Sequence, residues 1–133
     1  MLKGNEFLVS QNGLYRAIMQ QNGNFAVYKN EKALWASNTN DVGTGPYVLH
    51  MQIDNNLVIY DDYGKTIWTS NTQNSGDLKT GYLNMQDDGN LVLYSGEDGT
   101  PLWESKTYDG ESPYWGTGHL LKGIKNIYVR ERT

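Results

Sequence analysis

The chain has 133 residues and a formal net charge of −4, with 15 glycines, 10 tyrosines and no cysteine. Its length suits a single domain, and its acidic balance argues against nucleic acid or an acidic membrane as the main partner. The absence of cysteine excludes a disulfide framework and a thiolate metal site.

The N-terminal segment, MLKGNEFLVSQNGLYR, lacks the apolar core of a secretory signal. No stretch of the chain approaches the ~20 apolar residues that a transmembrane helix needs. We therefore expect a soluble protein that is cytoplasmic or secreted by a non-classical route.

The first predicted element is the segment MQQNGNFAVY at residues 19–28, which recurs as MQIDNNLVIY at 51–60 and as MQDDGNLVLY at 85–94. The polar half of each copy predicts a hairpin turn, because its centre holds Gly or Asn, which tolerate positive φ. The apolar half alternates along its length and predicts a strand. The strand residues expected to face the core are Phe25, Val27, Leu57, Ile59, Leu91 and Leu93.

The second predicted element reads LWASNT at 34–39, IWTSNT at 67–72 and LWESKT at 102–107. Its tryptophans, Trp35, Trp68 and Trp103, follow the glutamines of the first element by 15, 16 and 17 residues. Two markers in phase indicate three repeats, at about 3–39, 40–72 and 73–107, within one domain spanning 1–107. We expect the three indoles to meet at a centre that no single repeat could build.

The repeat period of 32–34 residues also occurs in helical arrays, but helical periodicity is nearly absent here. Each repeat instead accommodates about four short strands, which predicts an all-β, pseudo-threefold closed fold of about twelve strands. The β-trefoil is an alternative of similar length and symmetry, although its Gln-x-Trp markers do not occur in this chain.

Candidate binding residues alternate with the core-facing ones and point to the other face of the strand. Any turn would select Asp and Asn, but it would not require Gln, Val and Tyr on an exposed face. Together they offer a carboxylate, two carboxamides, a phenol and an apolar floor, which suit a neutral ligand with several neighbouring hydroxyls. The two full sets are Gln52, Asp54, Asn56, Val58 and Tyr60 in the second repeat, and Gln86, Asp88, Asn90, Val92 and Tyr94 in the third.

The first repeat departs from this pattern. It keeps Gln20, Asn24 and Tyr28, but Asn22 replaces the Asp and Ala26 replaces the Val. Loss of the carboxylate exchanges a charge-assisted hydrogen bond of roughly 1.5–3 kcal/mol for a neutral one nearer 1 kcal/mol. We therefore expect this site to be degenerate and the weakest of the three.

The pattern Gln-x-Asp-x-Asn-x-Val-x-Tyr, repeated about every 33 residues with a trailing Trp, resembles that of the bulb-type (monocot mannose-binding) lectin family. The resemblance covers residues 3–107 and implies a β-prism II fold of three four-stranded antiparallel sheets, with α-mannose bound in the groove of each repeat. It implies no catalysis and no metal or other cofactor. Plant members commonly carry a disulfide, so this chain looks closer to cysteine-free relatives.

The resemblance also implies a role for each residue of the motif. In the second repeat Asp54 and Asn56 would bind the 2-hydroxyl of mannose and Gln52 the 3-hydroxyl. Tyr60 would bind the 4-hydroxyl, and Val58 would pack on the ring carbons. The corresponding residues of the third repeat take the same roles. Each shallow site would bind only at about the millimolar level, so the repeats predict multivalent recognition of mannose-rich glycans.

Two other classes of function are alternatives to a lectin. An interaction module that has lost sugar binding would act through protein partners, although the two full motifs argue against it. A glycoside-processing enzyme would need two facing carboxylates, whereas only one carboxylate per repeat recurs at a fixed place.

Residues 108–133 extend beyond the third tryptophan segment. Ile127 and Val129 alternate and predict a strand, which would either cover an edge of its own chain or be exchanged in a homodimer or higher homo-oligomer. A distinct partner or a membrane contact is a further alternative. The apolar anchors are Tyr114, Trp115, Leu120 and Leu121, and the basic residues are Lys122, Lys125, Arg130 and Arg132.

Overall fold

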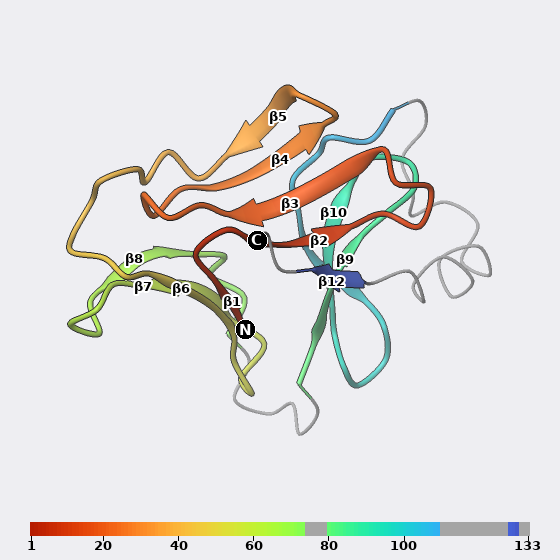
Figure 1. Cartoon of the computed structure of the whole chain (residues 1–133). Helices are drawn as coiled ribbons and strands as arrows, with labels where there is room; N and C mark the ends of the chain where they lie inside the picture. The colour runs from red at the N-terminus through yellow and green to blue at the C-terminus, as the bar shows by residue number, and fades with distance from the viewer. Residues whose placement is uncertain (74–79, 110–127, 131–133) are drawn as a thin grey trace.

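A computed structural model describes residues 1–73, 80–109 and 128–130, and these residues form β-strands and connecting turns (Figure 1). The strands are β1 (Leu2–Lys3), β2 (Glu6–Val9), β3 (Tyr15–Met19), β4 (Phe25–Lys29), β5 (Lys32–Ala36), β6 (Val48–Met51), β7 (Leu57–Tyr60), β8 (Thr66–Thr69), β9 (Tyr82–Met85), β10 (Leu91–Tyr94), β11 (Pro101–Glu104) and β12 (Tyr128–Arg130). Nothing in the described ranges forms a helix that could span a membrane.

The strands form three antiparallel sheets that surround a shared interior (Figure 1). Three consecutive strands of each repeat make one ladder: β3-β4-β5, β6-β7-β8 and β9-β10-β11. The predicted all-β fold with one antiparallel sheet per repeat is therefore confirmed.

In the described residues, only the second sheet has the four strands that were expected of every sheet. The sheets of the first, second and third repeats contain five, four and three strands in the described residues. The difference arises at the chain ends, because β1 pairs with β6 of the second repeat, with Leu2 opposite Leu49. At the other end β12 joins the first sheet beside β2, with Tyr128 opposite Val9.

The strand β12 lies in the C-terminal extension and pairs with β2 of its own chain. Exchange of this segment between protomers is untested and stays a prediction. The remaining positions that we singled out in the extension, namely Tyr114, Trp115, Leu120, Leu121, Lys122, Lys125, Ile127 and Arg132, lie outside the described residues.

The hairpin turns follow the sequence prediction. The central residues Gly23, Asn55 and Gly89 have φ values of 93°, 71° and 93°. Each turn is closed by a backbone hydrogen bond to the carbonyl of the motif glutamine, at 3.0 Å in all three repeats. The ladders also share an irregularity, because the register shifts after Val27, Ile59 and Leu93. The three repeats are therefore copies of one backbone design.

The turns also connect each repeat to the next one around the ring. A Cβ at Gly23 would lie 2.8 Å from the ring of Tyr47, and one at Gly89 would lie 2.7 Å from the ring of Tyr15. At the remaining junction the turn residue is Asn55, whose Oδ1 accepts a hydrogen bond of 2.6 Å from the backbone N–H of Gly81. The three contacts close a cycle from the first repeat to the second, the third and back to the first.

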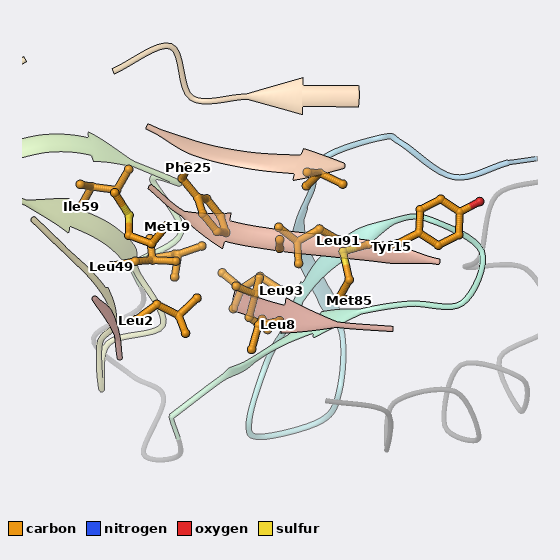
Figure 2. Close-up of a cluster of buried hydrophobic side chains, with 14 of the residues drawn as sticks. Leu2, Leu8, Tyr15, Met19, Phe25, Leu49, Ile59, Met85, Leu91 and Leu93 are labelled. Carbon is orange, nitrogen blue, oxygen red and sulfur yellow. The ribbon is translucent and has the colours of Figure 1, made fainter. Parts of the chain in front are cut away.

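The core fills the space between the three sheets. Figure 2 shows Phe25, Leu49, Ile59, Leu91 and Leu93 pointing toward this common interior from different sheets. All six residues predicted to face the core belong to this cluster and are almost fully buried, which confirms the assignment of the two strand faces.

The three repeated tryptophans meet edge to face at the predicted centre. Ring centroids are 5.8 Å apart for Trp35 and Trp68, 5.3 Å for Trp35 and Trp103, and 5.6 Å for Trp68 and Trp103. Their interplanar angles of 69–78° match the arrangement that aromatic quadrupoles favour. This Trp triangle therefore fixes the strands β5, β8 and β11 relative to one another.

Candidate functional site

The motif residues of each repeat lie on the sheet face opposite the core, and we refer to them as the first, second and third sites. They are Gln20, Asn22, Asn24, Ala26 and Tyr28 in the first site, Gln52, Asp54, Asn56, Val58 and Tyr60 in the second, and Gln86, Asp88, Asn90, Val92 and Tyr94 in the third. In each repeat the turn and the following strand bring these residues together.

In each site the glutamine amide donates a hydrogen bond to the tyrosine hydroxyl on the neighbouring strand. The pairs are Gln20–Tyr28 at 3.1 Å, Gln52–Tyr60, and Gln86–Tyr94 at 2.8 Å. Because the tyrosine oxygen accepts this bond, its own proton remains available as a donor. No donor from the described part of the chain reaches the glutamine Oε1, which therefore remains available as an acceptor.

The residue two positions after the glutamine holds the turn. Oδ1 of Asp54 accepts from the backbone N–H of Asn56 at 3.0 Å, and Asp88 does the same in the third site at 2.9 Å. In the first site Asn22 makes the equivalent bond to Asn24 at 3.0 Å. An amide oxygen therefore serves the turn as well as a carboxylate does, and the fold itself does not require the charge.

The asparagine of the motif anchors the segment that follows the tryptophan. Oδ1 of Asn56 accepts from the Thr69 hydroxyl at 2.8 Å, the Ser70 hydroxyl at 3.2 Å and the Thr72 backbone N–H at 3.1 Å. Asn24 and Asn90 bind the corresponding Ser and Thr residues of their repeats. These residues belong to the Ser-x-Thr pattern that follows every tryptophan, and this pattern is the sequence signal for partners of the asparagine.

The amide nitrogen of this asparagine distinguishes the sites. Within the described ranges, Nδ2 of Asn24 and of Asn56 donates no hydrogen bond, so it is open to a ligand. In the third site Nδ2 of Asn90 donates to Oε1 of Glu104 at 3.1 Å.

The strand register adds flanking residues that are not among the predicted site residues. In the second sheet His50 and Thr69 lie directly opposite Val58, one on each neighbouring strand. In the third sheet Asn84 and Glu104 occupy the same places beside Val92. His50 and Asn84 lie two residues before the motif glutamine of their repeats. This fixed spacing is the sequence signal that could have identified them.

The apolar floor is more deeply buried than expected for an outer face. Val58 is 2% exposed and Val92 is fully buried, although neither belongs to the core cluster. Tyr60 is half-buried, whereas Tyr94 is fully buried. Burial, followed by the nearby Asp88 carboxylate, raises the pKa of Tyr94 well above its ordinary value.

Comparison with known proteins finds similar sequences over most of the chain. Residues 35–115 match the family model described as D-mannose binding lectin. The chain is 37% identical over 109 residues to the B-type lectin plumieribetin of Scorpaena plumieri, covering 82% of this chain and 91% of that protein. It is 35% identical over 99 residues to a mannose-specific lectin of Aloe arborescens, covering 71% and 82%.

Solved structures of mannose-binding lectins also resemble this chain. A monomeric monocot mannose-binding lectin from Gastrodia elata superposes with a TM-score of 0.71 at 36% identity, covering 81% of this chain and 92% of that one. The snowdrop (Galanthus nivalis) mannose-specific agglutinin, solved with methyl-α-D-mannoside, gives a TM-score of 0.64 at 36% identity, covering 82% and 92%. Both similarities extend over most of each chain.

Proposed function

Because this chain belongs to the D-mannose binding lectin family, we propose that it binds α-mannose and mannose-rich glycans through its repeated motif sites, without catalysis. The observation that carries this proposal is the set of hydrogen-bonding atoms that the second site leaves open once its internal bonds are made. Asn56 and Tyr60 alternate with Val58 along the chain and therefore share its face of the sheet.

The second site balances donors and acceptors. The open acceptors are Oε1 of Gln52 and the second carboxylate oxygen of Asp54, for which the described residues provide no hydrogen-bond partner. The open donors are the Tyr60 hydroxyl and Nδ2 of Asn56. A sugar hydroxyl both donates and accepts, so neighbouring hydroxyls of one ring can satisfy such a set.

We assign the individual contacts from the family resemblance. Asp54 and Asn56 would bind the 2-hydroxyl, Gln52 the 3-hydroxyl and Tyr60 the 4-hydroxyl, while Val58 would pack on the ring carbons. The third site would use Gln86, Asp88, Asn90, Tyr94 and Val92 in the same roles. The first site would bind most weakly through Gln20, Asn22, Asn24 and Tyr28, because it has no carboxylate.

The absence of catalysis is part of the proposal. Glycoside hydrolysis in most enzyme families uses two facing carboxyl groups. Asp54 is the single carboxylate among the motif residues of the second site, and one of its oxygens already holds the turn. The extra carboxylate of the third repeat, Glu104, is bonded to Asn90.

Several weak sites on three sheets support a multivalent mode of action. A site of this size corresponds to about 4 kcal/mol of binding free energy, or about 1 mM. Useful affinity would then come from engaging several branches of one glycan or several glycans on one surface. The same reasoning favours a homodimer or a larger homo-oligomer, which analytical ultracentrifugation of the full chain would detect.

The test is a titration of the full chain with methyl α-mannoside, followed in two-dimensional amide NMR spectra. The backbone amides of Asn24, Asn56 and Asn90 report on the three sites separately. We expect saturable shifts at the second site with a dissociation constant of about 1 mM. Methyl α-glucoside, which differs in the orientation of the 2-hydroxyl, should bind more weakly.

The matched variants are Asp54→Asn and Asp62→Asn, which remove the same charge inside and outside the site. Asn22 already holds the equivalent turn in the first site, so Asp54→Asn should fold normally. Loss of the charge-assisted bond should weaken binding roughly 3- to 30-fold. Asp62 is exposed, and its variant should bind like the wild type. If no site responds to mannoside in the folded wild type, the proposal is wrong and an interaction with protein partners takes its place.

A further inference from the structure

The third site differs from the second at two flanking positions of the sheet. Glu104 lies opposite Val92, where Thr69 lies opposite Val58 in the second sheet and Ala36 lies opposite Ala26 in the first. Residues directly opposite on an antiparallel pair point to the same face of the sheet. A long carboxylate therefore lies over the third site, where the other two carry a small residue.

Glu104 binds the group that a ligand would use. Its Oε1 accepts from Nδ2 of Asn90 at 3.1 Å, the nitrogen that stays open in Asn24 and Asn56. Asn90 is fully buried, whereas Asn56 is partly exposed. The asparagine of the third site is therefore withdrawn from solvent.

The second difference lies on the opposite flank. Tyr82 lies opposite Tyr94 and stacks on it, with ring centroids 5.5 Å apart and an interplanar angle of 26°. The corresponding neighbour of Tyr60 in the second sheet is the smaller Val48. Tyr94 is fully buried and Gln86 is 7% exposed, whereas Gln52 and Tyr60 are both partly exposed. The two hydrogen-bonding groups at this end of the third site are therefore covered.

We propose that Glu104, assisted by Tyr82, closes the third site in the free protein, so that the second site is the principal sugar site and Glu104 determines this ranking. The inference rests on the proposed function, since it concerns which of the repeated sites a mannoside enters. A ligand at the third site would have to displace the Glu104 carboxylate from Asn90 and separate Tyr82 from Tyr94. Neither step is needed at the second site.

The third site retains the side chains that a sugar-binding site needs. All five motif residues are present, and Oε1 of Gln86 is a buried acceptor with no hydrogen-bond partner in the described residues. Buried acceptors usually have a donor, and a sugar hydroxyl could supply one here. Removal of the covering side chain should therefore make the third site bind.

The experiment exchanges the flanking residues and measures each site by the same NMR titration with methyl α-mannoside. In the wild type we expect binding at the third site to be at least about tenfold weaker than at the second, which corresponds to the loss of roughly one hydrogen bond. Glu104→Thr, which places the residue of the second repeat in the third, should strengthen the third site by about tenfold. Tyr82→Val should strengthen it less, because the Asn90 amide stays occupied.

The reciprocal variant is Thr69→Glu, which should weaken the second site by about the same tenfold factor. Thr69 also donates to Asn56, so Thr69→Ala serves as its control. The first repeat has Ala36 at this place, and the alanine variant should keep most of the binding at the second site. Retained amide spectra will confirm that each variant is folded.

A measurement without sugar tests the same contact. Hydrogen exchange of the Asn90 side-chain amide should be slower than that of Asn56 in the wild type and should accelerate in Glu104→Thr. Equal mannoside affinity at the second and third wild-type sites, or no gain at the third site in Glu104→Thr, would overturn this inference and leave the proposed function standing. No binding at any site would overturn both.

Discussion

The Trp triangle allows a stability prediction in which the three members are not equivalent. Among the described residues, Trp68 and Trp103 each make two aromatic contacts, both within the triangle. Trp35 contacts both of the other tryptophans and also packs edge to face on Phe25. The Trp35 and Phe25 ring centroids are 5.9 Å apart, and the interplanar angle is 82°. Replacing Trp35 by leucine should therefore destabilise the fold more than the same change at Trp68 or Trp103.

The magnitude follows from the number of pairs lost. An aromatic pair contributes about 0.5–1.5 kcal/mol beyond the burial of its area. Loss of two pairs in Trp68→Leu or Trp103→Leu should thus cost about 1–3 kcal/mol, and loss of three in Trp35→Leu about 1.5–4.5 kcal/mol. Leucine retains part of the apolar contact in all three variants. The difference in unfolding free energy between Trp35→Leu and either of the other two variants should therefore equal the contribution of one aromatic pair, about 1 kcal/mol.

The assay is urea unfolding of each variant, followed by far-UV circular dichroism and by tryptophan fluorescence. Similar m-values across the series would show that the same surface is exposed on unfolding. Tyr63→Leu is the control, because Tyr63 is 82% exposed and its variant should stay within about 0.5 kcal/mol of the wild type. If Trp68→Leu proved as destabilising as Trp35→Leu, the additive treatment of the pairs would be refuted.

Two further predictions separate structure from binding. Asn56→Ala removes an acceptor of three hydrogen bonds and should lower the free energy of unfolding, measured in urea, by about 2–3 kcal/mol. Asn56→Asp keeps the acceptor oxygen but loses the amide donor. It should therefore lose mannoside affinity with a smaller loss of stability. In alkaline solution, burial and the nearby Asp88 charge raise the pKa of Tyr94, so the native state binds this proton more tightly than the unfolded chain does. That contribution to stability is complete below about pH 10 and is lost as the pH rises through the native pKa. The urea midpoint should therefore fall above about pH 10, and less steeply in Tyr94→Phe; an identical pH profile for both proteins would contradict this assignment.

The local features of the fold could be predicted from the sequence because each has a local cause. The positive φ at the turns follows from Gly and Asn at their centres, and the core face of NLVIY follows from strict alternation. The meeting of the three indoles follows from their fixed place in each repeat.

The features that escaped prediction depend on partners distant in the sequence. The pairing of Leu2 with Leu49 and of Tyr128 with Val9 decides the strand count of two sheets, and no short-range pattern encodes it. The contact of Glu104 with Asn90 depends on the strand register, which the sequence pattern does not specify. The position after Trp103 therefore acquires its significance only through the strand pairing, which brings Glu104 to Asn90.

The cycle of turn contacts has a consequence for how proteins of this kind can evolve. In an open array each added unit finds a free face, so copies accumulate and are lost easily. Here Gly23 meets Tyr47, Asn55 meets Gly81 and Gly89 meets Tyr15, so a fourth repeat would have no free junction to occupy. Deletion of one repeat would leave two unmatched junctions and break the Trp triangle. The copy number is thus fixed at three by geometry, and further binding capacity can arise only by altering existing sites or by joining whole chains.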